Sequence, residues 1–129
     1  MPPLENLQRV PIYHLESLGR QGIFTTGLLL EVSETRTRRQ YLADQIGATT
    51  NDVNEWRDEA LLLNLANFGP DEQALFTQAG IIGLSDLVAL DMPDYTLRLQ
   101  RAARTLAMEM PAELTVEGWM EQAHTLREE

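Results

Sequence analysis

The side chains with the clearest chemical potential in this sequence are its arginines, which bind carboxylates and phosphates through paired N–H donors. All ten basic residues of the chain are arginine. Six of them fall into two clusters, which we take as candidate contacts for a partner or an anion: Arg36, Arg38, Arg39, Arg98, Arg101 and Arg104. If the chain has an anion-binding site, we therefore expect it at one of these two clusters.

The second cluster is spaced by three residues along a predicted helix. At about 100° per residue, Arg98, Arg101 and Arg104 form a stripe on the side of the helix that faces away from its apolar side. A solvated helix face is the simpler interpretation of this stripe. The alternative is a surface on which an acidic partner or phosphate groups dock.

The first cluster lies where a helix is predicted to begin, near Arg36. Positive charge in the first turn of a helix is mildly unfavourable because of the helix dipole. Glu31 and Glu34 are close enough in sequence to offset this repulsion. Local pairing is therefore the simpler interpretation, and an anionic ligand or partner is the alternative.

Residues suited to catalysis or to metal binding do not form a recognisable pattern. His14 and His124 lie far apart in sequence, and neither has a ligand at metal-site spacing. The acidic pair Asp58-Glu59 reads as ordinary helix surface. The chain has no cysteine, and the sequence motifs of phosphate-binding loops, serine hydrolases and zinc proteases are absent. We therefore expect a protein that is not an enzyme, with no catalytic residue, no metal and no cofactor.

Charge and hydropathy narrow the classes of partner. A formal net charge of −10 opposes binding to a phosphate backbone, since affinity there comes from cations that displace counterions. No apolar run approaches the roughly 20 residues that span a bilayer, and the N-terminus lacks the basic and apolar regions of a signal peptide. We expect a cytoplasmic protein that binds another protein, without a membrane span and with an oligomeric state left open.

The arginine clusters must be positioned by helices, because apolar residues recur at helical spacing and no stretch alternates at period two. The prediction is an all-α fold of seven or eight helices. Leu28, Leu29 and Leu30 are expected to be largely buried, and a helix of about residues 51–66 is expected to be the longest. The residues expected to cap helix N-termini are Thr25, Thr49 or Thr50, Ser85, Asp91 and Thr115.

Two echoes along the chain predict an internal repeat. Gly22-Ile23 recurs as Gly80-Ile81, with Phe76 placed where Leu18 stands. The pattern Val-x-x-Trp-x-x-x-Ala begins at Val53 and again at Val116, and it contains the two tryptophans, which we expect in the core. The expected division is an arm of residues 1–10, a first helical half of residues 11–66 and a second helical half of residues 67–129 that shares its core.

The order of these motifs resembles an uncharacterised family of tandem helix-hairpin-helix-like domains, catalogued as a domain of unknown function. The motifs are Gly22-Ile23-Phe24-Thr25 with Leu28 to Leu30, Val53-x-x-Trp56, Gly80-Ile81 and Trp119-Met120-Glu121-Gln122-Ala123. The resemblance covers roughly residues 9 to 126. It implies two tandem helix-hairpin-helix-like halves packed as one compact helical domain, and the family has no settled activity to transfer.

Both hairpins depart from the Gly-apolar-Gly pattern that holds phosphate through backbone N–H groups. The first hairpin has Arg9 and Pro11 in place of the two glycines. The second hairpin is Asn67, Phe68 and Gly69, which keeps one glycine, but acidic residues follow it directly. Residues 67 to 69 are therefore the candidate hairpin contacts.

Together these observations favour a non-enzymatic protein–protein adaptor on a duplicated helix-hairpin-helix-like scaffold. The arginine clusters would supply the charge complementary to an acidic patch on its partner. The alternative is a nucleic-acid-binding helix-hairpin-helix protein that uses the second hairpin and the arginine clusters.

Overall fold

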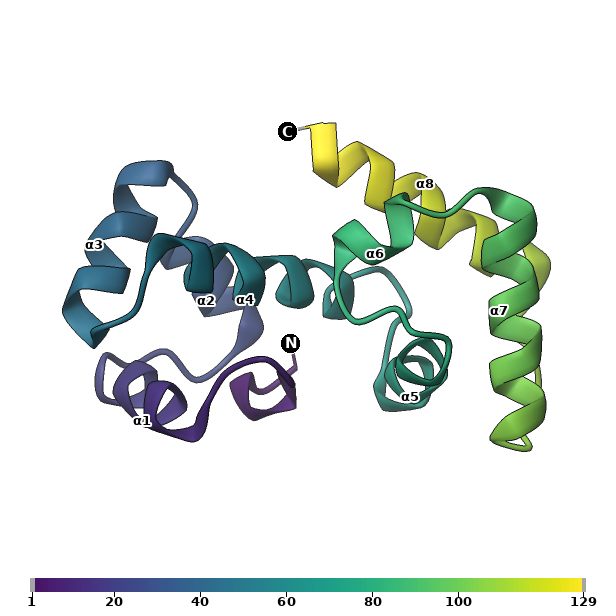
Figure 1. Ribbon diagram of the computed structural model, residues 1–129, viewed down its shortest axis with the longest axis horizontal. Helices are drawn as coiled ribbons and strands as arrows, with labels where there is room; N and C mark the ends of the chain where they lie inside the picture. Colours follow the sequence, from purple (N-terminus) through teal and green to yellow (C-terminus); the bar gives the residue numbers. More distant parts are fainter. Residues whose placement is uncertain (1, 129) are drawn as a thin grey trace. The chain divides into compact units, whose positions relative to one another are not determined.

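The computed structural model describes the backbone of residues 2–128 and is helical (Figure 1). In this part of the chain there are eight α-helices, a short 3-10 helix and no strand, which confirms the all-α prediction. The elements are η1 (Leu4–Asn6), α1 (Ile12–Arg20), α2 (Thr26–Val32), α3 (Arg36–Ile46), α4 (Thr50–Leu63), α5 (Pro70–Gln78), α6 (Leu84–Val88), α7 (Met92–Thr105) and α8 (Glu113–Glu128).

Helices α2, α3, α4 and α7 begin after a residue whose side chain accepts a hydrogen bond from the first turn. The Thr25 hydroxyl accepts from the Leu28 N–H at the start of α2, and the Asp91 carboxylate accepts from Asp94 at the start of α7. At α4 the Thr49 hydroxyl and the Asp52 carboxylate cap each other's backbone N–H groups. The hydrogen bond from the Thr49 N–H is the main cause that lowers the pKa of Asp52. Three of the predicted N-caps are thereby confirmed.

Two helix starts differ from the prediction. Helix α6 begins at Leu84 after Gly83, rather than behind a cap at Ser85. The Asp86 carboxylate instead accepts the N–H groups of Ile82 and Gly83, both at 3.0 Å, so an acid inside the first turn replaces the hydroxyl cap. Helix α8 already begins at Glu113 and not behind Thr115.

Two expectations about helix length and burial were also wrong. With 16 residues α8 is longer than α4, which has 14 residues and ends at Leu63 because Asn64 closes its last turn. Of the three leucines on α2 only Leu29 is fully buried, and Leu28 is exposed. A helix of seven residues presents only one side to its core, so three consecutive apolar residues cannot all be covered.

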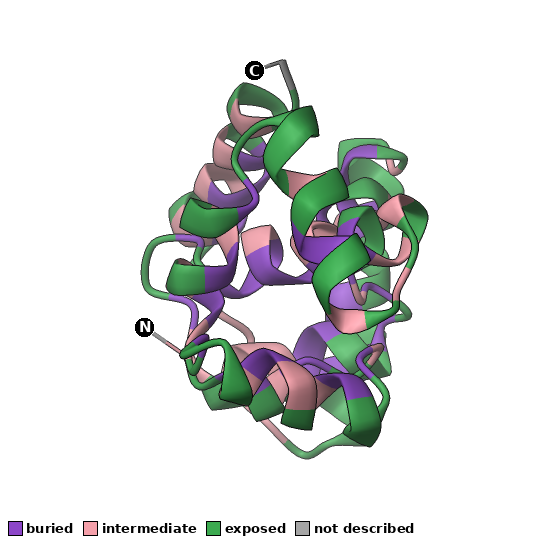
Figure 2. Cartoon of the chain, turned by 90° about the vertical axis from the view of Figure 1, so that its left-hand side faces the viewer, coloured by how far each residue is buried: buried purple, intermediate pink, exposed green. Residues whose placement is uncertain are grey.

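The chain divides into two compact units, one ending at Asn64 and the other beginning at Leu65. In the first unit, the segment before α1 packs against the rest through Leu4, Leu7 and Val10, which are all buried. Its backbone pairs with the turn before α2, since the Leu4 N–H donates to the Phe24 carbonyl at 2.9 Å. Buried stretches are purple in Figure 2. A core shared between the two halves remains a prediction.

The second unit is built around four aromatic rings. Phe76 on α5 meets Phe68, Tyr95 and Trp119 edge-on, at centroid distances of 4.9, 6.1 and 5.4 Å. The Trp119 indole N–H donates to the Ala66 carbonyl at 2.8 Å. Trp119 and, in the first unit, Trp56 are both buried, as predicted. None of the described helices has the length and apolar content needed to cross a membrane.

Candidate functional site

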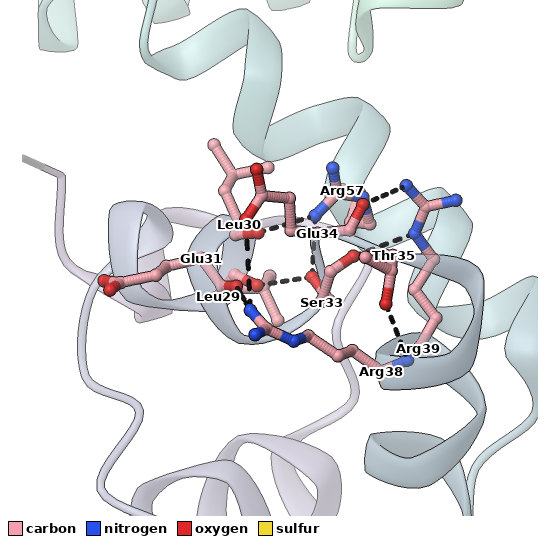
Figure 3. Close-up of polar contacts among 9 residues, drawn as sticks. All are labelled: Leu29, Leu30, Glu31, Ser33, Glu34, Thr35, Arg38, Arg39 and Arg57. Atoms are coloured by element: carbon pink, nitrogen blue, oxygen red, sulfur yellow. Dashed lines mark hydrogen bonds and ion pairs between the residues drawn. The ribbon is translucent and has the colours of Figure 1, made fainter.

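Two arginines of the first cluster, Arg38 and Arg39, bind the end of α2 and the residues that follow it (Figure 3). Arg38 donates to the Glu31 carbonyl at 3.5 Å and lies 3.9 Å from the Glu34 carboxylate. Arg39 donates to the carbonyls of Ser33 at 2.9 Å and Glu34 at 3.2 Å. No N–H group of a helix donates to its last carbonyls, which carry a negative partial charge. An arginine side chain near the helix end can donate to them and so stabilises the end of the helix. These two side chains therefore have a structural role in local pairing.

A third arginine joins this group from α4, and sequence reasoning missed it. Arg57 donates to the Leu30 carbonyl at 2.9 Å and to the Ser33 hydroxyl at 2.7 Å. The buried Ser33 hydroxyl in turn donates to the Leu29 carbonyl. Burial lowers the pKa of Arg57, and the nearby Arg39 acts in the same direction. No signal in the sequence distinguished Arg57 beyond its place beside the buried Trp56.

Arg36, the remaining member of the first cluster, is exposed. Its side chain makes no hydrogen bond or ion pair with any residue that the structure describes. The first cluster therefore leaves one guanidinium for an outside partner, and a lone surface arginine is a weak site.

The second cluster lies on α7 in the second unit, and all three of its side chains are exposed. Arg98 pairs with Asp94 at 3.4 Å, one turn earlier on the same helix. Arg101 and Arg104 form no hydrogen bond or ion pair through their side chains within residues 2–127. The second cluster thus keeps two guanidinium groups that nothing in the described chain neutralises.

A shallow depression of about 170 Å³ lies along this part of α7, where α7 meets the end of α5. Arg98 reaches the end of α5, since a Cβ added at Gly80 would lie 3.6 Å from its guanidinium. Donor groups from two helices therefore line one hollow. Its residues are Gln78, Ala79, Arg98, Arg101, Ala102 and Thr105.

The second hairpin has already used the N–H groups that the nucleic-acid alternative requires. The Phe68 N–H donates to the Leu65 carbonyl at 3.2 Å, and the Gly69 N–H donates to the Glu72 carboxylate at 2.8 Å. Asn67 is exposed and left-handed, with φ 58°, while the Phe68 ring is buried against Phe76 and Trp119. A phosphate at this turn would have to displace a carboxylate of the chain itself.

The first hairpin also holds a carboxylate, and here the surface assignment of Glu59 was wrong. Glu59 is fully buried, and its two oxygens accept the N–H groups of Gln8 at 2.5 Å and Arg9 at 3.0 Å. Two successive N–H groups of this kind form a concave anion site. Burial raises the pKa of Glu59, although these two hydrogen bonds oppose the shift. Asp58, 3.7 Å from the Arg9 guanidinium, is half-buried.

The two histidines belong to different units and differ in environment. His14 is buried in the first unit, 5.2 Å from the Trp56 ring, and its Nδ1 has no hydrogen-bond partner within the described chain. His124 is exposed on α8. Among residues 2–127, no three side chains of histidine, aspartate or glutamate come together in a metal-binding group.

Comparison with known proteins identifies one family. The model of the family described as "Domain of unknown function (DUF4332)" matches residues 13–126. No curated protein matches the chain. No solved structure matches it either.

Proposed function

The chain belongs to the DUF4332 family, and from that premise we propose that it is a non-enzymatic module that binds an acidic segment of a partner protein through α7. One observation carries the proposal. Arg101 and Arg104 are exposed and their side chains are unpaired within the described chain, and Arg101 lines a hollow together with Arg98 and Gln78. The guanidinium groups of the first cluster are mostly committed to the end of α2.

The charge distribution supports a partner with a localised acidic patch. The arginines on α7 stand out on a chain with a formal net charge of −10, and Arg127 is the only other arginine after Leu65. An acidic segment is attracted to the stripe and repelled by the surrounding carboxylates, which fixes its position. Carboxylates of such a segment fit the forked donors of Arg101 and Arg104, and Gln78 is a neutral donor that lines the same hollow as Arg101.

The same features make nucleic acid the weaker candidate. A phosphate backbone needs several cations together, and the net charge of the chain repels it. The Phe68 and Gly69 N–H groups also have acceptors within the second unit. A duplicated helix-hairpin-helix-like scaffold is compatible with both partners, so the test includes both.

A pair of double variants tests the proposal. Arg101→Glu/Arg104→Glu reverses the stripe, and Arg36→Glu/Arg127→Glu makes the same change of net charge at exposed positions elsewhere. Each protein is immobilised and used to capture partners from lysate of its native source, and the captured proteins are quantified by mass spectrometry. We expect acidic proteins that bind wild type and the control variant to be reduced at least about tenfold on the α7 variant, as losing two charge-assisted contacts implies.

Labelled single-stranded and duplex DNA and RNA are titrated in parallel at about 50 and 200 mM salt. Binding that weakens steeply with salt and disappears in the α7 variant would replace the acidic protein by a nucleic acid as partner. Equal capture by the two double variants would remove α7 as the docking surface.

A further inference from the structure

The second unit contains a larger cavity on the other flank of α7. Its volume is about 350 Å³, within the range of small-molecule sites. Met92, Met110, Pro111 and Val116 supply apolar lining, and Thr96 and Gln100 from α7 complete one side. Glu113 and Glu117, one turn apart on α8, supply two carboxylates. A hollow lined partly by apolar side chains and partly by two carboxylates is a different site from the arginine stripe.

The chain between α7 and α8 forms this cavity. Helix α7 ends at Thr105, and Ala107 takes a left-handed conformation with φ 53°, which reverses the chain. Met110 and Pro111 then lie across from the first turns of α7, where Met92 stands. The Tyr95 hydroxyl donates to the Val116 carbonyl at 2.9 Å and so fixes the start of α8 against α7. Burial raises the pKa of Tyr95, which keeps this donor protonated.

The electrostatics of the cavity favour a cation. The starts of α7 and α8 each place about +0.5 elementary charge nearby, which opposes a cation. The Asp91 carboxylate already caps the start of α7. Glu113 and Glu117, which line the cavity near the start of α8, carry two formal negative charges. The two formal charges of the carboxylates outweigh the partial charges of the helix starts, so the cavity favours a cation.

We infer that this cavity binds an organic cation with an apolar tail, meaning a primary ammonium or guanidinium group carried on a short aliphatic chain. The charged end lies between Glu113 and Glu117, and the aliphatic part contacts Met92, Met110 and Val116. Methionine adapts its shape to an alkyl chain, which suits such a ligand. The ligand is either a free amine or a lysine side chain, and its site is separate from the α7 arginines.

Three probes of equal length test the inference: hexylamine, 1-hexanol and hexanoate. They are titrated into protein carrying ¹³C-labelled methionine methyl groups, and the shifts are followed by NMR. We expect hexylamine to saturate and to shift Met92 and Met110, while Met120, buried outside the cavity lining, stays unchanged. Hexanol should bind at least about tenfold more weakly, and hexanoate weaker still, as losing a hydrogen bond between charged groups implies.

Matched variants decide whether the charge preference arises in the cavity. Glu113→Gln/Glu117→Gln should abolish the difference between hexylamine and hexanol, and Glu121→Gln, exposed on the same helix, should leave it intact. Equal binding of the three probes, absence of saturation, or an unchanged preference in the double variant would each overturn the inference. Acetyl-Leu-Lys-Leu-amide is titrated beside hexylamine. Tighter binding of the peptide would assign the cation to a lysine of a protein, and tighter binding of hexylamine would assign it to a free amine.

Discussion

The two units share a repeated Trp-x-x-x-Ala pattern, but their interiors are built from different chemistry. The buried polar side chains of the described chain, His14, Thr26, Ser33 and Glu59, all lie in the first unit. The second unit packs aromatic rings around Phe76 instead. The first interior contains the buried carboxylate Glu59 and its hydrogen bonds, whereas the second is packed by aromatic rings, two of which, Tyr95 and Trp119, also donate to backbone carbonyls.

This difference decides where polar groups remain for other molecules. The first unit uses Glu59 to bind its own N-terminal segment and Arg57 to close its own helix. The second unit keeps its core apolar, so the charged side chains of α7 and of the start of α8 stay at the surface. Both sites that we propose therefore fall in the second unit.

The strongest test of the comparison is Phe76→Ala, with Leu18→Ala as its counterpart in the first unit. Both residues are fully buried, and Phe76 stands where the predicted repeat would place Leu18. We expect Phe76→Ala to lower the free energy of unfolding by about 4 kcal/mol, because a cavity forms and three ring contacts are lost. Leu18→Ala should lower it by at least about 1 kcal/mol less. Urea denaturation followed by circular dichroism measures both, and equal losses would mean that the ring contacts add nothing beyond burial.

A second test removes the buried carboxylate of the first unit. Glu59→Leu leaves two N–H groups without their acceptor, and we expect it to lower the free energy of unfolding by about 2 kcal/mol at neutral pH. Glu59→Gln keeps one acceptor and removes a buried charge, so it should cost less than half of that amount. The two variants and wild type are compared by urea denaturation.

The raised pKa of Glu59 also predicts that the free energy of unfolding depends on pH, and the same variants test this. Since the pKa of Glu59 is raised in the folded protein, the folded state takes up a proton at a higher pH than the unfolded chain. The contribution of Glu59 to stability therefore increases as the pH falls from neutral through its raised pKa, and it is lost as the pH rises again. Wild type should gain stability relative to Glu59→Gln over this range, and a constant difference between them would contradict the assignment.

The smallest expected change in stability comes from placing a glycine in each predicted hairpin. Asn67 is left-handed, so Asn67→Gly should change the free energy of unfolding by no more than about 0.5 kcal/mol. Arg9 is not left-handed and pairs with Asp58, so Arg9→Gly should lower it by about 1 kcal/mol. Thermal denaturation of the two variants tests this, and similar losses would mean that the two hairpins do not differ in backbone conformation.

The sequence predicts the helices well and the polar interior poorly. Thr25, Thr49 and Asp91 act locally, so the residues beside them are enough to place α2, α4 and α7. The two N–H groups that Glu59 accepts and the Leu30 carbonyl that Arg57 binds are backbone groups about 50 and 27 residues away, and a backbone group leaves no trace in the residue types. The α7 stripe follows from spacing alone, but the cavity at Glu113 needs the reversal at Ala107, a residue that rarely takes a left-handed conformation.

The placement of the two tryptophans gives the molecule an optical label in each unit. Trp56 and Trp119 are the only indoles in the chain, one lies in each unit, and both are buried. A buried indole emits at shorter wavelength than an indole in water, so Trp56→Phe leaves fluorescence that follows the second unit alone, and Trp119→Phe leaves the first. Unfolding curves of the two variants will show whether the two units unfold at the same temperature. A ligand that raises the unfolding temperature seen in only one of the variants binds the unit whose tryptophan that variant retains.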